Sequence, residues 1–352
     1  MNSPKFHVSS FKSALAAALL SACCAAPAFA ATTVAENFTS DPLQNGWKIF
    51  GETNLFQWDS TNHNLAVTWD SSRTNSYFYH PLGTILARDD DFTVAFDLRL
   101  NDIISGNEPG KTGPLEIGIG FFNFDDATNA AFGRGIYGGS PNMAEFDYFP
   151  AGYYDDGSGG VFTVTPTTTP TFISRGGFSY APTVFTPYAF EIPTNLWVHV
   201  AMTYTAAHQT LATALTTNGA LFIQLPDVVL TNSSTSGFGD ADDFRVNTFS
   251  ISSYSSVGDA YDSVLAHGEV ANVAVTVPPP PARNLAGAFS NGVWQVQFAD
   301  RTNWFYTLER SIDFQNWTDA SAATPGADTN LFLQDTNPPG EKVYYRVRAS
   351  RP

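Results

Sequence analysis

Apolar and polar residues alternate along much of the chain, which is the pattern of β-strands that bury one face. In residues 92–100 the apolar side chains fall on the even positions, and in residues 115–121 they fall on the odd ones. Residues 198–204 repeat the pattern, and the Asn218-Gly219 pair that follows is typical of a tight β-hairpin turn. Later strands are expected at residues 244–251 and 270–277. Because no long segment shows helical periodicity, we predict an all-β protein whose main part is a two-sheet jelly-roll sandwich.

Four consecutive prolines mark the sharpest boundary in the chain. They lie in "VPPPPAR", Val277 to Arg283, where missing backbone donors and fixed φ angles favour a stiff, extended spacer. The chain of 352 residues is long enough for two domains, each with its own core. We therefore predict a larger domain over residues 31–276, a proline-rich linker over 277–283 and a second, smaller β-sandwich domain over 284–352.

The first 30 residues have the composition of an export signal peptide. Lys5 and Lys12 supply a positive flank, and the apolar run from Ala14 to Ala22 is too short to span a membrane. The "AFA" ending at Ala30 fits a cleavage site, whereas "LSAC" ending at Cys23 resembles a bacterial lipobox whose cysteine would be acylated. We expect a secreted protein, extracellular or periplasmic, without a transmembrane segment. A lipoprotein anchored at Cys23 is the alternative.

Composition and charge narrow the choice of partners. Both cysteines, Cys23 and Cys24, lie in the signal segment, so the folded part must be held by its core or by bound ions. The net charge is −16, and it becomes more negative when Lys5 and Lys12 leave with the signal. Such an excess of acids disfavours nucleic acid and anionic lipid as partners. Oxygen-ligated cations and neutral glycans remain.

Two carboxylates stand two residues apart in "MAEFDYFPAGYYDD", Met143 to Asp156. If residues 143–149 form a strand, Phe146 and Tyr148 point to the core, while Glu145 and Asp147 share the opposite face. Their Cα atoms would be about 7 Å apart. Acids also gather at 89–91 and at 240–243, where Asp240, Asp242 and Asp243 form a second candidate calcium loop.

Two stretches of the larger domain resemble a known family. "DFTVAFDLRL" at 91–100 and "NLWVHVAMTYTAAHQTLATALTTNGALF" at 195–222 are similar to the strand-turn-strand signature of laminin-G-like domains. The resemblance implies the concanavalin-A-like jelly roll that legume lectins and laminarinase-type glucanases share. In the smaller domain, "WFYTLERSIDFQNWTDA" and "LQDTNPPGEKVYYRVRA" resemble fibronectin-type-III-like modules at the C-terminal ends of secreted bacterial proteins. That resemblance implies a spacer or docking module without chemistry.

The family resemblance implies different roles for the acid strand. Laminarinase-type glucanases carry a second Glu after Glu-x-Asp, but Phe149 and Pro150 stand there in this chain, so the general acid/base is missing. In the metal loop of legume lectins, Glu145, Asp147, Phe149 and Asp156 occupy matching positions, although Ala151 replaces an Asn. These four residues are the candidate calcium ligands. The third interpretation is a solvated strand face followed by an ordinary turn.

Tyrosines beside the acid strand are candidate sugar contacts, because pyranose rings stack on aromatic faces. Tyr153 and Tyr154 follow the strand, and Tyr137 lies in the glycine-rich stretch "GRGIYGG". The sequence thus favours a secreted, non-catalytic glycan-binding or adhesive protein that uses calcium and recognises a glycan or cell-surface polysaccharide. A glucanase-like hydrolase and a purely structural surface or matrix protein are the alternatives.

Overall fold

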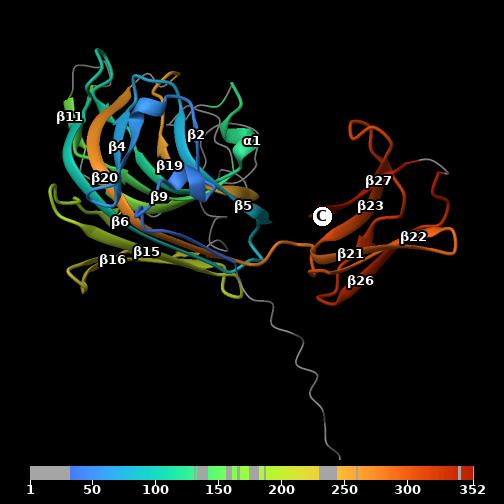
Figure 1. Cartoon of the computed structure of the whole chain (residues 1–352). Coiled ribbons are helices and arrows are strands. Elements are labelled where there is room, and N and C mark those ends of the chain that lie inside the picture. Colours follow the sequence, from blue (N-terminus) through green and yellow to red (C-terminus); the bar gives the residue numbers. More distant parts are fainter. Residues whose placement is uncertain are drawn as a thin grey trace, which may run out of the picture.

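A computed structural model describes residues 32–130, 132, 142–155, 161–164, 167–173, 182–185, 188–229, 244–258, 261–339 and 342–351, with the backbone alone between 152 and 189. The prediction of an all-β protein is confirmed, since strands dominate the described residues. Two larger sheets form a jelly-roll sandwich, and a smaller β unit follows it in the chain (Figure 1). Within the described part, no helix has the length and apolarity to cross a membrane.

One sheet of the sandwich is centred on the long strands β6 and β20. Its described strands run in the order β17 (Ala220–Gln224), β16 (Thr210–Thr217), β15 (Val198–Thr205), β6 (Phe92–Ser105), β20 (Asp262–Val277), β4 (Asn64–Asp70) and β3 (Phe56–Asp59). At its margins, β1 (Thr32–Glu36) and β7 (Gly113–Pro114) pair with β20, and β18 (Val228–Val229) pairs with β16. Asn218 and Gly219 both have positive φ between β16 and β17, as a tight hairpin turn requires.

The opposing sheet carries the acid strand. Its described order is β13 (Pro182–Phe185), β12 (Thr167–Ile173), β9 (Met143–Phe149), β8 (Ile117–Phe122), β19 (Val246–Ser253), β5 (Ser76–Leu86) and β2 (Lys48–Phe50), and β14 (Tyr188–Ala189) pairs with β12. The short elements around it are η1 (Pro42–Asn45), η2 (Thr53–Leu55), α1 (Phe124–Ala127) and the hairpin of β10 (Gly152–Asp155) with β11 (Val161–Val164). We call this sheet the acid-strand sheet.

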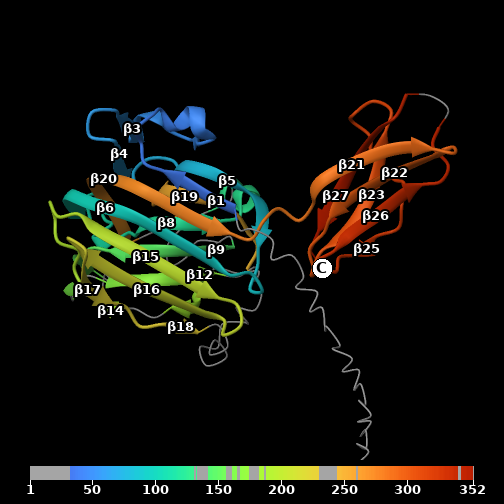
Figure 2. The ribbon, with the colours of Figure 1, turned by 60° about the horizontal axis from the view of Figure 1, so that its bottom comes forward.

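The two sheets of the sandwich lie one behind the other (Figure 2). The core lies between them, where aromatic side chains of alternating strand positions meet. Phe96 of β6 packs edge-on against Phe146 of β9, with ring centroids 5.8 Å apart. Phe92 packs in the same way on Phe121 of β8 at 5.1 Å. Each fully buried side chain of this size contributes about 1.5–3 kcal/mol to folding. The alternation predicted for β6, β8 and β15 therefore identifies their core faces correctly.

The smaller unit has its own apolar core. β21 (Arg283–Ser290), β22 (Val293–Ala299) and β26 (Asn330–Asp335) form one sheet, while β24 (Thr318–Asp319), β23 (Phe305–Ser311), β25 (Thr324–Pro325) and β27 (Tyr344–Ser350) form the other. The core between them contains Val296, Phe298, Trp304, Tyr306, Leu308 and Leu333. The resemblance of this unit to fibronectin-type-III-like modules stays a prediction.

Candidate functional site

The face of the acid-strand sheet that points away from the core collects the candidate chemistry. The strand register places Glu145, Gly120, Ser250, Tyr79 and Lys48 in one row across five neighbouring strands. Asp147, Gly118, Ser252, Tyr77 and Phe50 form the adjacent row. We call this surface the outer face. Because successive side chains alternate, all these residues lie opposite the core residues Phe146, Ile119 and Phe78.

Glu145 and Asp147 share the outer face but are not solvated. Each is only 1% exposed, because residues from distant segments cover the sheet at this point. The phenolic hydroxyl of Tyr254, which follows β19, donates a 2.6 Å hydrogen bond to Glu145 Oε1. Nearby, the Tyr77 hydroxyl donates to the backbone carbonyl of Ala127 in α1. The interpretation of these acids as a solvated strand face is therefore wrong.

The two carboxylates converge over a glycine of the neighbouring strand. A Cβ atom added to Gly118 would collide with Glu145 Oε2, and it would lie 2.7 Å from Tyr254 Cε2 and 3.4 Å from Asp147 Oδ1. Gly118 thus leaves the volume that both carboxylates occupy. The glycine residues of β8 serve close packing rather than a turn, since neither Gly118 nor Gly120 has a positive φ.

The remaining predicted ligands are not gathered by the described residues. Phe149 ends β9 and pairs with Thr167 of β12. Asp156, like Asp240, Asp242 and Asp243, lies outside the residues that the structure describes. Within those residues, no group of three or more His, Cys, Asp or Glu side chains gathers as metal ligands do. The described part of the site therefore consists of two converging buried carboxylates.

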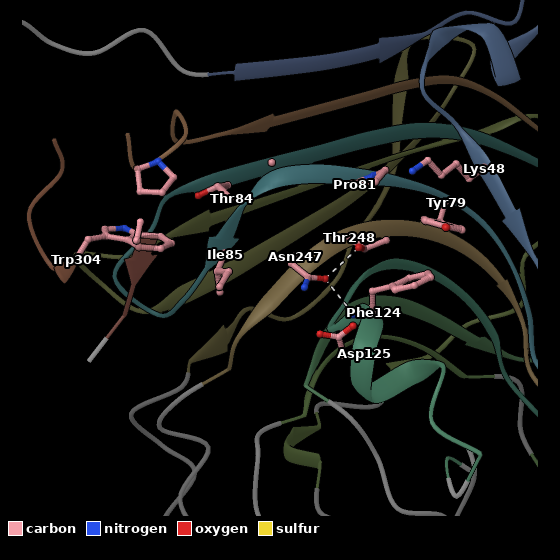
Figure 3. A pocket seen from close by; sticks show the side chains of 13 residues that line it. Lys48, Tyr79, Pro81, Thr84, Ile85, Phe124, Asp125, Asn247, Thr248 and Trp304 are labelled. Atoms are coloured by element: carbon pink, nitrogen blue, oxygen red, sulfur yellow. Dashed lines mark hydrogen bonds between the residues drawn. The ribbon is translucent and has the colours of Figure 1, made fainter. Parts of the chain in front are cut away.

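A pocket of about 460 Å³ opens at the other end of the outer face (Figure 3). Its lining from the sandwich includes Tyr79 of β5, Phe124 and Asp125 of α1, and Asn247 and Thr248 of β19. The rings of Tyr79 and Phe124 are tilted by 34° with centroids 4.6 Å apart, so they form one aromatic wall. Burial raises the pKa of Tyr79, which keeps its hydroxyl protonated as a donor.

The polar side chains of this pocket are held by local hydrogen bonds. Asn247 Oδ1 accepts from the backbone N–H of Phe124 at 2.9 Å and from Thr248 Oγ1 at 3.0 Å. Asn123 caps α1, because its Oδ1 accepts from the backbone N–H groups of Asp125 and Asp126. The cap fixes the exposed Asp125 beside the aromatic wall, and the Asn247 amide nitrogen has no hydrogen-bond partner among the described residues.

The proline-rich linker, through Pro281, and the smaller unit supply another wall of the same pocket. Pro281, Trp304 and Ala349 line it, and Figure 3 shows Trp304 at the opposite end of the view from Tyr79 and Lys48. Thr84 and Ile85, from the end of β5, lie between the two groups. The pocket is therefore an elongated space with aromatic residues from both units and polar groups between them.

The predicted sugar contacts do not include the residues of this pocket. Tyr137 lies outside the described residues, and Tyr153 and Tyr154 lie in β10, where the backbone alone is described. The sequence signal for Tyr79 was the aromatic run Tyr77-Phe78-Tyr79, in which a strand places Tyr79 on the face opposite Phe78. No local pattern marks Phe124 or Asn247, since only the fold brings them together.

Comparison with known proteins gives a fold-level likeness only. No protein-family model matches the chain, and a search of curated proteins finds no match. Among solved structures, peanut lectin is similar at 16% identity, covering 70% of this chain and 99% of that chain with a TM-score of 0.38. Lectin II from Ulex europaeus is similar at 13% identity, covering 71% of this chain and 99% of that chain with a TM-score of 0.41. The alginate lyase Aly36B in complex with alginate tetrasaccharide is similar at 14% identity, covering 69% of this chain and 96% of that chain with a TM-score of 0.34. At these identities and scores, no property of these proteins is transferred to this chain.

Proposed function

We propose that the protein binds a neutral glycan, without cleaving it, in the pocket beside Tyr79, Phe124 and Asn247. The observation that carries this proposal is the aromatic wall of Tyr79 and Phe124 next to fixed amide, carboxylate and hydroxyl groups. A pyranose ring presents an apolar C–H face, which stacks on such rings, and a rim of hydroxyls, which pair with Asn and Asp side chains. The pocket volume also lies in the range of small-ligand sites.

The negative charge of the chain favours a neutral ligand over a polyanionic one. The chain carries a net charge of −16, and the exposed Asp125 lines the pocket. A uronate or sulfate would meet this carboxylate as well as the overall field, although Lys48 offers one positive group at the margin. Hydroxyl groups meet no such repulsion.

We further propose that Glu145 and Asp147 hold a calcium ion, with the Phe149 carbonyl and Asp156 as additional ligands. The fit rests on the two carboxylates that converge over Gly118, because calcium prefers carboxylate and carbonyl oxygens. The bound ion would neutralise two buried like charges and link β9 to Asp156, which follows β10 in the chain. Since Glu145 and Tyr79 stand three strands apart, about 14 Å, the ion would act on the fold rather than on the sugar.

Hydrolysis is disfavoured by the same geometry. Neither Glu145 nor Asp147 lines the described pocket, and both are buried beneath Tyr254 and its neighbours. Phe149 at the end of β9 and the buried Pro150 just after it follow the two acids, and neither side chain can donate a proton to a leaving oxygen. Export by the N-terminal signal completes the proposal, because a secreted module meets glycans outside the cell.

The proposal is tested by a glycan array probed with the full mature chain, first in millimolar calcium and then in chelator. We expect binding to neutral oligosaccharides in calcium and weaker binding in chelator. Binding confined to acidic glycans would contradict the neutral ligand, and no binding in either condition would contradict glycan recognition and favour a structural role. Release of shortened oligosaccharides from a bound glycan would contradict the non-catalytic assignment.

A further inference from the structure

A buried ion cluster joins the sandwich to the smaller unit. Asp90, in the turn after β5, is 4% exposed, and its Oδ2 accepts from the backbone N–H of Ala87 at 3.0 Å. Arg301 Nη2 of the smaller unit donates to Asp90 Oδ1 at 2.7 Å. Arg351, the penultimate residue of the chain, pairs with Asp90 Oδ2 through its Nη2. One carboxylate of the sandwich thus receives two guanidinium groups from the smaller unit.

The same arginines hold the linker and the end of β5. Arg301 Nη1 donates to the Pro279 carbonyl at 2.8 Å, and Arg351 Nε donates to the Ile85 carbonyl at 3.1 Å. Both guanidinium groups lie over the Trp304 ring, at 4.7 Å for Arg351 and 6.0 Å for Arg301. These contacts involve both units and the segment between them, so they tie the smaller unit to the sandwich.

Asp90 is the shared partner of both guanidinium groups, so its removal would leave the buried Arg351 without a carboxylate. The side chains of Asp90 and Arg351 are 4% and 5% exposed, so neither can be solvated in place. Burial lowers the pKa of Arg351, which reflects the cost of keeping this cation out of water, and the charge of Asp90 opposes that effect. A buried ion pair of this kind holds two surfaces together mainly because an unpaired partner is costly.

The position of the smaller unit determines the shape of the pocket. Trp304, which lies beneath the two guanidinium groups, is also a pocket wall, as are Pro281 and Ala349. On the sandwich side, Ile85 packs against the core of the smaller unit and also lines the pocket. When the units separate, the pocket loses one wall while Tyr79, Phe124 and Asn247 stay in place on the sandwich.

We infer that the pocket is a composite site, in which the smaller unit forms part of the ligand-binding surface and the Asp90–Arg301–Arg351 cluster is the clamp that holds it closed. The ligand part of this inference rests on the proposed function. The ligand would be an oligosaccharide with at least two rings, one on Tyr79 and Phe124 and another against Pro281 and Ala349, beside the buried Trp304. The smaller unit then acts as a wall of the site, whereas the family resemblance implies a spacer or docking module without chemistry.

The clamp affects ligand affinity through the fraction of molecules in which the smaller unit is docked against the sandwich. A ligand that touches both walls binds only the docked state, so its apparent Kd rises as the inverse of the fraction docked. A variant that leaves one molecule in ten docked would therefore weaken binding ten-fold. The apparent Kd of a ligand that contacted the sandwich alone would not depend on the clamp.

The experiment compares the full mature chain with Arg351→Ala, Arg351→Lys and the control Arg348→Ala. Arg348 lies in β27 close to Arg351, but it pairs with Glu309 and Asp319 inside the smaller unit. Docking is measured without ligand, by small-angle X-ray scattering and by hydrogen exchange of the backbone amides of residues 83–87 and 282–283. Affinity is measured for the oligosaccharide that the array identifies.

Arg351→Ala is expected to increase the radius of gyration, to speed exchange of both segments at least ten-fold, and to weaken oligosaccharide binding about ten-fold. Arg351→Lys should restore docking only in part, because an ammonium lacks the planar fork of the guanidinium, and Arg348→Ala should match the wild type. Unchanged scattering and exchange in Arg351→Ala would overturn the clamp. Looser docking with unchanged affinity would overturn the composite site. If no glycan binds the wild type, the proposed function fails, and the clamp is judged on scattering and exchange alone.

Discussion

Gly118→Ala is the substitution that most directly challenges the geometry of the buried acids. The added methyl group would collide with Glu145 Oε2 and lie 2.7 Å from Tyr254 Cε2. Neither neighbour can move into solvent, since Glu145 is 1% and Tyr254 is 2% exposed. The carboxylate would have to rotate away, which breaks its 2.6 Å hydrogen bond from the Tyr254 hydroxyl.

The expected loss of stability follows from three contributions. Overpacking a buried site costs about 1–3 kcal/mol. Loss of a buried hydrogen bond to a charged group costs about 1.5–3 kcal/mol. Replacing glycine in a strand returns about 0.5–1 kcal/mol through the reduced entropy of the unfolded chain. The net effect on the free energy of unfolding is therefore about 2–5 kcal/mol, or a fall in Tm of roughly 4–20 °C for a unit of this size.

The assay is urea unfolding of the full mature chain in chelator, so that no bound cation contributes, followed by a double-mutant cycle with Glu145→Ala. If the collision with the carboxylate causes the loss, Gly118→Ala should cost much less in the Glu145→Ala background, with a coupling energy above about 1 kcal/mol. A loss below about 1 kcal/mol in the wild type, or additive effects in the cycle, would show that the carboxylates do not lie over Gly118.

Three further outcomes are expected. Millimolar calcium should raise the Tm of the sandwich relative to chelator, with a stabilisation of about 2.7 kcal/mol at one hundred times Kd. No Tm shift in the wild type would exclude a bound calcium ion. A Tm shift that persists in Asp147→Asn would indicate that the ion binds at residues 240–243 instead. Laminarin should remain intact, because no second acid follows on the acid strand; turnover that Glu145→Gln abolishes would contradict this. Residues 31–276 and 284–352, expressed apart, should each melt cooperatively, as each has its own core; if neither does, the boundary is misplaced.

Strand identity and core faces could be predicted because they depend on local alternation. The sequence places Phe146 and Tyr148 in the core and the two acids opposite them, and the structure agrees. Burial of the acids could not be predicted, because it depends on Tyr254, more than a hundred positions away in the chain. A two-residue period states which face a side chain takes and says nothing about what covers that face.

The pocket shows the same limit more strongly. Tyr79, Phe124, Asn247 and Trp304 come from four distant segments, and only the sheet register and the docked smaller unit bring them together. The sequence favoured Tyr153 and Tyr154 because they adjoin the acids, which is a criterion of proximity along the chain. Asp90 likewise stood out only as one of several acidic residues, since its partners Arg301 and Arg351 lie beyond the proline-rich linker.

The measurement that tests glycan recognition most directly is a calorimetric titration of the best array oligosaccharide into the wild type, Tyr79→Ala and Phe222→Ala. Phe222 is a matched control, because it is an aromatic side chain 41% exposed on β17 of the other sheet. Loss of the Tyr79 ring should weaken binding by about 1–2 kcal/mol, or roughly five- to thirty-fold. Phe222→Ala should bind as the wild type does. Equal affinities for the wild type and Tyr79→Ala would contradict the account, because the ligand would then occupy a surface other than this pocket.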